Sequence, residues 1–284
     1  MRTFKNLTEN VQEAITMPYG TDFNRPANPE EGMVRYNTTQ DALEFYNGTI
    51  WSVLGDSQVI PNEVTDGLFC HWDASNSSSY SGTGSTVSDL QGTYDLTING
   101  SVGYNSSGIK YFNFNGNSSN YFSYTNSILK DFSNANLTFV AWVNFNSISN
   151  AYQFIIDDIA TSGTRTATLG IDTSGDLFGN VTYGTGNQSK SSTTISSGTW
   201  YQVAFTYSAT DGSKLYVNVD LLDSNSNVFT PDFGNHSLFT VGRYAYNGNY
   251  SLDAKISDIK IYNRTLSSDE ITQNFNATKT RFGL

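Results

Sequence analysis

The sequence predicts an all-β fold, a β-sandwich that ends in a short helix, and three observations support that prediction. Apolar and polar residues alternate in several short segments, most regularly in residues 137–145 and 200–207, which is the period of a half-buried strand. Clusters of Gly, Asn, Asp and Ser separate such segments roughly every ten residues, a spacing typical of sandwiches and barrels. A helical pattern with a capping signal appears after Leu266, close to the end of the chain.

The composition narrows the classes of function. The chain has 284 residues, with 15 Lys and Arg against 26 Asp and Glu, and a net charge of -11. Because Lys and Arg bind phosphate backbones, we expect no nucleic-acid partner. No run of about 18 apolar residues occurs, so we expect no membrane insertion. The first eight residues lack the apolar stretch of a secretory signal, and the single cysteine excludes an intrachain disulfide.

The N-terminal segments differ in pattern from the rest of the chain. Residues 1–20 show little periodicity, and we expect an anchoring arm that becomes ordered against a partner. Residues 21–60 are predicted to form a small β-module, because the turn cluster 25–32 precedes a short strand and Asn47-Gly48 is a hairpin signal. Two hairpins are only marginally stable alone, so this module is expected to need a second copy or a host protein.

Residues 61–66 are interpreted as a linker and residues 67–284 as the sandwich domain. The predicted strands of this domain are short, apolar on at least one face and separated by turn residues. They cover 68–74, 111–115, 137–145, 153–157, 168–172, 177–181, 200–207, 215–219, 239–243 and 254–262.

The last predicted strand contains a change of phase. Ile259 and Ile261 share one face, but Ile256 lies an odd number of residues away from both. A β-bulge near Ser257-Asp258 would keep all three isoleucines inward, because a bulge inserts one extra residue into one strand of a pair.

The terminal helix has a complete start signal. Ser267 is placed to cap the helix, and Glu270 is placed to reach back to the cap. Leu266 and Ile271 are positioned to form a hydrophobic staple across this start. Ile271 and Phe275 then share one helical face, four residues apart.

These segments resemble laminin-G-like, concanavalin-A-like lectin domains over about residues 65–284. The resemblance is carried by Gly67-Leu68, Trp72-Asp73-Ala74, 79–84, Phe112-Asn113-Phe114-Asn115-Gly116, 200–207 and the strand, corner and helix of 255–271. It implies a concanavalin-A-like jelly-roll β-sandwich with a short C-terminal helix. Two departures, Asn115 where the family usually has Asp and 218–220 where it often has Asp-Gly, weaken the inference of a calcium site.

Two further segments resemble structural proteins of tailed phages. The module of 21–60 is similar to the small β-module near the N-terminus of phage fibre and appendage proteins, and the tail 274–284 is similar to the C-termini of such lectin domains in tailed phages, particularly cyanophages. The resemblance implies a virion structural protein of the tail, neck or head fibre type. Residues 1–60 would bind other virion proteins, and the lectin-like domain would face outward to adhere to host-surface glycans.

The same resemblance implies a location and an assembly. The protein would lie on the virion surface, having been made in the host cytoplasm without a signal peptide, and would be a homo-oligomer, with a trimer as the first hypothesis. Two alternatives stay open. One is a capsid decoration protein with a purely structural role, and the other is a polysaccharide depolymerase.

The acidic residues favour a protein that is not an enzyme. Sugar hydrolases of the jelly-roll type use two carboxylates about 5–9 Å apart. Glu270 is the only glutamate in residues 65–284, and its position is that of a helix cap. Asp157 and Asp158 are adjacent in a predicted strand, so their side chains point to opposite faces.

Candidate ligand-binding residues lie in two loops rich in Tyr, Asn and Gly. Exposed aromatic rings present apolar faces on which sugars stack, and the alternative is that the tyrosines cover the sandwich rim or a subunit contact. The candidates are Tyr183, Asn187, Tyr244, Tyr246, Asn247 and Tyr250.

No cofactor is expected, with calcium as the one alternative. Asp73, Asp157 and Asp158 are the candidate metal ligands, since carboxylate oxygens bind calcium. Asp172 and Asp176 belong to a segment that is more simply interpreted as a hairpin turn, with Asp and Gly present for backbone reasons.

Overall fold

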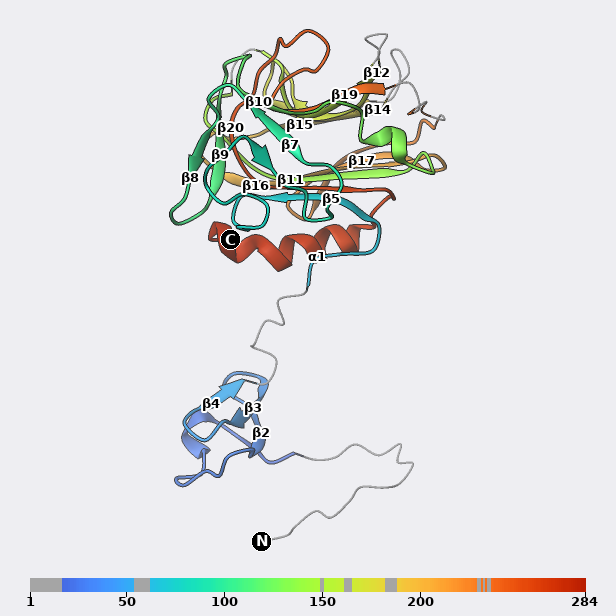
Figure 1. Ribbon diagram of the computed structural model, residues 1–284. Helices are drawn as coiled ribbons and strands as arrows, with labels where there is room; N and C mark the ends of the chain where they lie inside the picture. The colour runs from blue at the N-terminus through green and yellow to red at the C-terminus, as the bar shows by residue number, and fades with distance from the viewer. Residues whose placement is uncertain are drawn as a thin grey trace. The chain divides into compact units, whose positions relative to one another are not determined.

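The computed structural model describes residues 17–53, 62–148, 151–160, 165–181, 188–228, 231, 233 and 236–284. The chain divides into two compact units, Met1–Ile60 and Pro61–Leu284, and each is described by itself (Figure 1). Within the described residues, no helix combines the length and the apolar character needed to cross a membrane.

The first unit is a four-stranded sheet with the order β1-β2-β3-β4. Its elements are β1 (Tyr19–Gly20), η1 (Asp22–Asn24), β2 (Val34–Asn37), β3 (Ala42–Tyr46) and β4 (Trp51–Val53). β1 runs parallel to β2, and the other pairs are antiparallel. The last two residues of the segment predicted as an arm therefore belong to this sheet, whereas residues 1–16 of that arm lie outside the described residues.

The Asn47-Gly48 turn joins β3 and β4. The Asn47 Oδ1 atom accepts the backbone N–H groups of Thr49 and Ile50, both at 2.9 Å, and Gly48 has a φ of 90°. Glycine takes this backbone conformation without strain, so the hairpin signal in the sequence has the structure that it predicts.

Polar groups occupy the interior of the first unit. The buried residues of 17–53 are Arg35, Asn37 and Glu44, and none of the buried residues described there is apolar. Glu44 accepts hydrogen bonds from Arg25 at 2.6 Å and from Asn37 at 2.8 Å. Phe23 is 98% exposed. This unit therefore has little of the apolar burial that stabilises small domains.

The second unit is a sandwich of two eight-stranded sheets, which Figure 1 shows as two stacked layers. One sheet contains, in order, β15 (Gln188–Thr194), β14 (Asp176–Val181), β13 (Arg165–Ile171), β12 (Gln153–Ala160), β19 (His236–Val241), β10 (Tyr121–Tyr124), β7 (Leu96–Asn99) and β6 (Thr86–Val87). The other contains β18 (Asp220–Asn225), β17 (Gly212–Val217), β16 (Trp200–Ser208), β11 (Leu137–Phe145), β20 (Asp253–Tyr262), β9 (Tyr111–Asn115) and β8 (Gly103–Asn105), and β5 (Leu68–Asp73) pairs with β20. A short η2 (Leu129–Asp131) lies between β10 and β11.

The core fills the space between the two sheets. On β11 the alternating residues Leu137, Phe139, Ala141, Val143 and Phe145 all belong to the core cluster, as the sequence period predicts. The neighbouring strands of both sheets contribute aliphatic and aromatic side chains to the same cluster. The predicted fold, a concanavalin-like β-sandwich with one short C-terminal helix, is confirmed.

The predicted β-bulge in β20 is also confirmed. Trp142 pairs with Asp258 while Val143 pairs with Ile256, so the register shifts at Ser257. Ile256, Ile259 and Ile261 are consequently all in the core, at 2% exposure or less.

The C-terminal helix α1 (Ser268–Thr278) covers the outer face of the sheet that contains β11 (Figure 1), and η4 (Lys279–Phe282) follows it. Ser267 and Glu270 form the predicted capping box, and Leu266 and Ile271 pack in one cluster. Arg264 donates to both oxygens of Glu270, at 2.9 and 2.6 Å. The stacking of Trp142 on Phe275 attaches the helix to the sheet.

Part of the segment predicted as a linker packs against this helix. Val64 is 6% exposed, and its backbone N–H donates to Asn274 Oδ1 at 2.8 Å. The Tyr262 hydroxyl donates to the Val64 carbonyl at 3.0 Å. Residues around Val64 are thus part of the second unit, which begins at Pro61.

Candidate functional site

A closed loop after β19 forms the candidate site. The Leu252 N–H donates to the Gly242 carbonyl at 2.8 Å and closes the base of the loop, while Tyr244 and Asn249 are joined across it at 3.2 Å. Gly242 has a φ of 93°, and a Cβ atom there would lie 2.6 Å from the ring of Phe114. The loop can therefore leave the sheet at this point only because residue 242 has no side chain.

The tyrosines of this loop have two different roles. Tyr244 is 7% exposed and stacks on Phe154 of β12, with ring centroids 5.2 Å apart. Tyr246 and Tyr250 are 61% and 42% exposed. Tyr250 also contacts Tyr152 edge-on, at 5.7 Å between centroids. Tyr244 thus fixes the loop to the sheet, and the other two rings offer apolar faces to a ligand.

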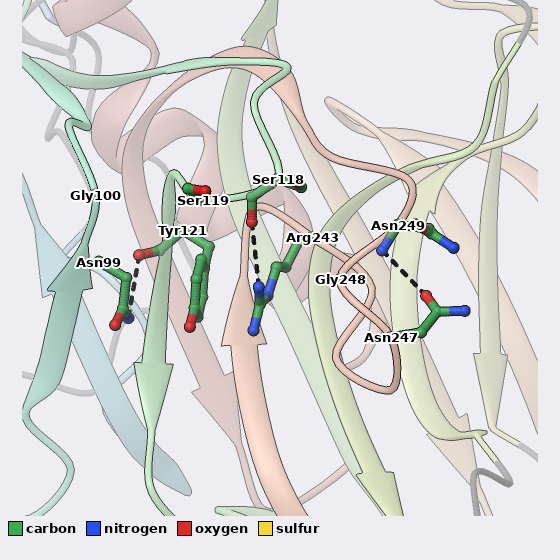
Figure 2. A pocket seen from close by; sticks show the side chains of 9 residues that line it. All are labelled: Asn99, Gly100, Ser118, Ser119, Tyr121, Arg243, Asn247, Gly248 and Asn249. Atoms are coloured by element: carbon green, nitrogen blue, oxygen red, sulfur yellow. Dashed lines mark hydrogen bonds between the residues drawn. The ribbon is translucent and has the colours of Figure 1, made fainter.

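The same loop contributes Asn247, Gly248 and Asn249 to a polar pocket of about 380 Å³. This volume falls in the range of about 300–1,000 Å³ in which small-molecule sites are found. The residues that line it come from the ends of β7, β10 and β19 and from the loops next to them (Figure 2). They are Asn99, Gly100, Ser118, Ser119, Tyr121, Arg243, Asn247, Gly248 and Asn249.

The Arg243 guanidinium is the charged group of the pocket. Its central carbon lies 3.3 Å from the centroid of the Tyr121 ring, and its Nη1 donates to the Ser118 carbonyl at 3.1 Å. On the other side, a Cβ atom on Gly248 would be 3.1 Å from Nη1, so the loop backbone lies against the guanidinium. Burial lowers the pKa of Arg243 from its ordinary value, although a guanidinium stays charged in proteins.

Asparagine amides form the neutral part of the site. Asn247 Oδ1 accepts the Asn249 N–H at 3.0 Å, which orders the tip of the loop. Asn99 donates to the Ser123 hydroxyl at 2.9 Å. Figure 2 shows Asn99, Tyr121 and Arg243 side by side on adjacent strands. The pocket combines hydrogen-bonding amides with one cation, and the loop that lines it also carries exposed rings, which suits a hydroxylated ligand better than an apolar one.

The six predicted ligand-binding residues differ in their position and exposure in the structure. Asn247 lines the pocket, Tyr246 and Tyr250 are exposed on the same loop, and Tyr244 is largely buried beneath them. Tyr183 and Asn187 lie outside the described residues. The role of all six residues as ligand contacts stays a prediction.

Sequence reasoning did not find Arg243, Tyr121 or Asn99. These residues are far apart in the chain and meet because β10 pairs with both β7 and β19. The signal that was present is a single arginine directly before the Tyr- and Asn-rich loop.

The carboxylates predicted as calcium ligands have partners within the protein. Asp73 accepts from Arg281 at 2.9 Å, Asp158 accepts from Ser127 Oγ at 2.7 Å, and Asp157 accepts the Ala245 N–H at 2.8 Å. Asp157 and Asp158 contact separate segments, in agreement with their expected opposite orientation. The prediction of no cofactor, and calcium as its alternative at these positions, both stay untested.

Asp172 and Asp176 form the expected turn. Asp172 Oδ1 accepts the backbone N–H groups of Ser174 at 2.8 Å and Asp176 at 3.1 Å. Gly175 has a φ of 81°. These contacts give the aspartate and the glycine backbone roles, as the hairpin interpretation of the segment predicts.

A second acidic group lies on β5 and β20. Oxygen or nitrogen atoms of His71, Asp73 and Asp258 are within 4.8 Å of one another. Lys260, however, pairs with Asp258 and with Glu63, the latter at 2.6 Å. Although burial acts to raise it, the charge of Lys260 holds the pKa of Asp258 below its ordinary value. The side-chain cations already neutralise these acids, so the arrangement is that of a buried ion-pair network.

Comparison with known proteins places this site in a known fold. Residues 115–272, more than half of the chain, match the laminin-G-type family model described as the Concanavalin A-like lectin/glucanases superfamily. No curated protein matches the sequence.

Solved structures with the same fold include enzymes and receptor-binding domains. Trypanosoma rangeli sialidase in complex with sialic acid has a TM-score of 0.59 at 17% identity, covering 88% of this chain and 44% of that chain. The binding domain of botulinum neurotoxin DC in complex with rat synaptotagmin II has a TM-score of 0.58 at 16% identity, covering 75% of this chain and 52% of that chain. A structure described as a receptor binding domain has a TM-score of 0.60 at 16% identity, covering 78% and 53%. This chain therefore spans about half the length of the solved proteins that it matches, and the likeness concerns the fold.

These neighbours correct one prediction. The prediction that the chain is not an enzyme is wrong, because sialidases are among the solved structures that share the fold. The argument considered a pair of glutamates and the adjacent Asp157 and Asp158, and a carboxylate pair is one catalytic arrangement among several in sugar hydrolysis. The enzymatic status of the chain is therefore open.

The match over residues 115–272 and the two-sheet architecture lead to one conclusion. The chain belongs to the Concanavalin A-like lectin/glucanases superfamily through a laminin-G-type domain.

Proposed function

We propose that this protein is a structural component of a tailed-phage particle that binds host-surface glycans through the loop after β19. The observation that carries the glycan part is a single loop that exposes two rings, Tyr246 and Tyr250, and also lines a polar pocket with Asn247. Sugars present apolar C–H faces and hydroxyl groups together, and this loop offers both aromatic faces and amides.

The geometry favours binding over simple coverage of the sandwich rim. Tyr244 already covers the sheet by stacking on Phe154, and Tyr250 packs near the same ring, so Tyr246, at 61% exposure, is not needed for that purpose. Tyr250 is held with a φ of 59°, in the left-handed region that a tyrosine rarely adopts. A strained, exposed aromatic residue is the type of feature that is found at binding sites.

A glycan array with the full chain tests this part. Tyr246→Ala and Tyr250→Ala should each weaken binding to the best glycan about tenfold, the factor for the loss of about 1.4 kcal/mol of ring stacking. Tyr19→Ala is the matched control, because Tyr19 is also exposed, at 74%, but belongs to the first unit. Unchanged affinity in both loop variants would contradict the assignment of this surface.

We propose that residues 1–60 attach the protein to other virion proteins and that it assembles as a homo-oligomer, first of all a trimer. The first unit buries only Arg35, Asn37 and Glu44 among its described residues, and it exposes Phe23 almost completely. A sheet with so little apolar burial is expected to gain stability by covering its exposed side chains with a partner.

Deletion of residues 1–60 tests the attachment. The shortened protein should keep the circular dichroism spectrum of the sandwich and should be absent from purified particles, and light scattering should show whether the oligomer is also lost. Normal incorporation of the shortened protein would refute the attachment role. A capsid decoration protein would show attachment in this experiment but no binding on the glycan array.

A further inference from the structure

Arg243 differs from the other arginines whose side chains the structure describes. Each of the others forms an ion pair with a carboxylate: Arg25 and Arg35 with Glu44, Arg264 with Glu270, and Arg281 with Asp73. In the described part of the chain, Arg243 has its contacts with the Tyr121 ring and the Ser118 carbonyl, and no carboxylate pairs with it. This is notable in a chain with 26 acidic against 15 basic residues.

The hydrogen-bonding capacity of Arg243 is mostly unused. A guanidinium has five N–H donors, and among the described residues Arg243 interacts in this way with the Ser118 carbonyl, at 3.1 Å, and with the Tyr121 side chain. Its Nε atom is buried without a partner. An uncompensated, partly buried cation costs free energy, so its retention at a pocket points to an anion that is supplied from outside.

The pocket holds the guanidinium in a fixed orientation. The Tyr121 ring lies on one side and Gly248 on the other, and Figure 2 shows the side chain between them, with its hydrogen bond to Ser118. Cation–π stacking leaves the edge of the guanidinium available, and that edge matches two oxygens of one anionic group. The neighbouring asparagines carry no charge and so do not repel an anion.

We propose that this pocket recognises the anionic substituent, a carboxylate or a sulfate ester, of an acidic saccharide, with Arg243 as the specificity-determining residue. This inference rests on the proposed glycan-binding function and names the class of glycan. The exposed rings of Tyr246 and Tyr250 would contact the sugar, and Arg243 would select the charged member of a family of similar sugars.

Binding of matched probe pairs to the full chain, measured by calorimetry at one fixed ionic strength, tests the proposal. The pairs are trigalacturonate and its methyl ester, sialyllactose and lactose, and sulfated and unsulfated lactose. The wild-type protein should bind at least one acidic probe about tenfold more tightly than its neutral partner, as expected for one charge-assisted pair. The identity of that pair distinguishes a carboxylate from a sulfate.

Variants then assign the preference to Arg243. Arg243→Gln should remove the preference for the acidic probe and leave binding of the neutral one, and Arg243→Lys should keep only part of it, since lysine lacks the planar fork. Lys214→Gln, which removes an exposed positive charge on β17, should leave the preference unchanged. If Arg243→Gln does not fold, Asn247→Asp serves instead. It places a carboxylate at the pocket edge and should reduce binding of the acidic probe several-fold.

The outcomes separate the two proposals. Binding of neutral saccharides without any preference for the acidic partners, or a preference that survives both Arg243→Gln and Asn247→Asp, would overturn this inference and leave the proposed function intact. Absence of binding to every saccharide on the array would remove the proposed function and this inference with it.

Discussion

Replacement of Trp142 by alanine should detach the C-terminal helix from the sandwich and greatly lower the stability of the second unit. Trp142 is 1% exposed and stacks on Phe282 at 3.9 Å and on Phe275 at 5.7 Å between centroids. Its Nε1 donates to the Thr278 hydroxyl at 2.8 Å. The indole is therefore the main contact between β11 and the terminal helices.

The expected loss follows from these contacts. A buried aromatic side chain removes roughly 200 Å² from water, which at about 25 cal/mol per Å² gives about 5 kcal/mol as an upper value. Residual burial in the unfolded chain reduces this figure, and measured Trp→Ala changes fall at about 3–5 kcal/mol. We therefore expect a loss of about 4 kcal/mol, a large part of the stability of an ordinary domain.

Guanidinium unfolding followed by far-ultraviolet circular dichroism measures this change. Trp142→Phe is the matched control, because it keeps an aromatic ring for stacking but removes the N–H donor to Thr278, and it should cost about 1–2 kcal/mol. The role given to this contact would be refuted if Trp142→Ala lowered the free energy of unfolding by less than about 1 kcal/mol and left its slope against denaturant concentration unchanged.

Three further predictions concern the second unit. The hydrogen bonds from Arg264 lower the pKa of Glu270 to about 2 from 4.5. The ionised Glu270 should therefore stabilise the folded protein above pH 4.5, and this contribution should disappear as the pH falls through about 2. Glu270→Gln should flatten that part of the plot of unfolding free energy against pH, and an identical plot would contradict the link between Glu270 ionisation and stability. Gly179→Ala should destabilise the sandwich by about 3 kcal/mol or more in thermal unfolding, because a Cβ atom there would lie 2.0 Å from the Phe205 ring. Cys70 is fully buried, and burial also raises the pKa of its thiol, so a thiol reagent should reach it only when the protein unfolds; rapid labelling of the native protein would show that β5 opens on its own.

Local signals in the sequence were sufficient for much of the fold. Ser267 and Glu270 define the helix start within four residues, and the Asn47-Gly48 turn needs no distant contact. The phase of Ile256 against Ile259 predicted the bulge because burial of both requires it. Each of these inferences depends on a period or a cap that neighbouring residues specify.

The candidate site depends on contacts that local signals do not contain. The loop of Tyr246, Asn247 and Tyr250 was visible as a composition, but Arg243 gains its meaning from Tyr121, which reaches it through the pairing of β10 with β19. Val64 was assigned to a linker because its partners, Asn274 and Tyr262, are about two hundred residues away in the chain. Strand order, rather than any single motif, brings these residues together.

The extra residue at Ser257 also restricts how β20 can change during evolution. Loss of Ser257 itself would leave Ile256 and Ile259 two positions apart, so both would stay inward in a regular strand without the bulge. Loss of a residue beside the bulge, such as Lys255, would instead exchange the inward and outward positions on one side of the deletion. A single-residue gap in β20 is therefore expected at the bulge, and other length variation is expected in the loops between strands.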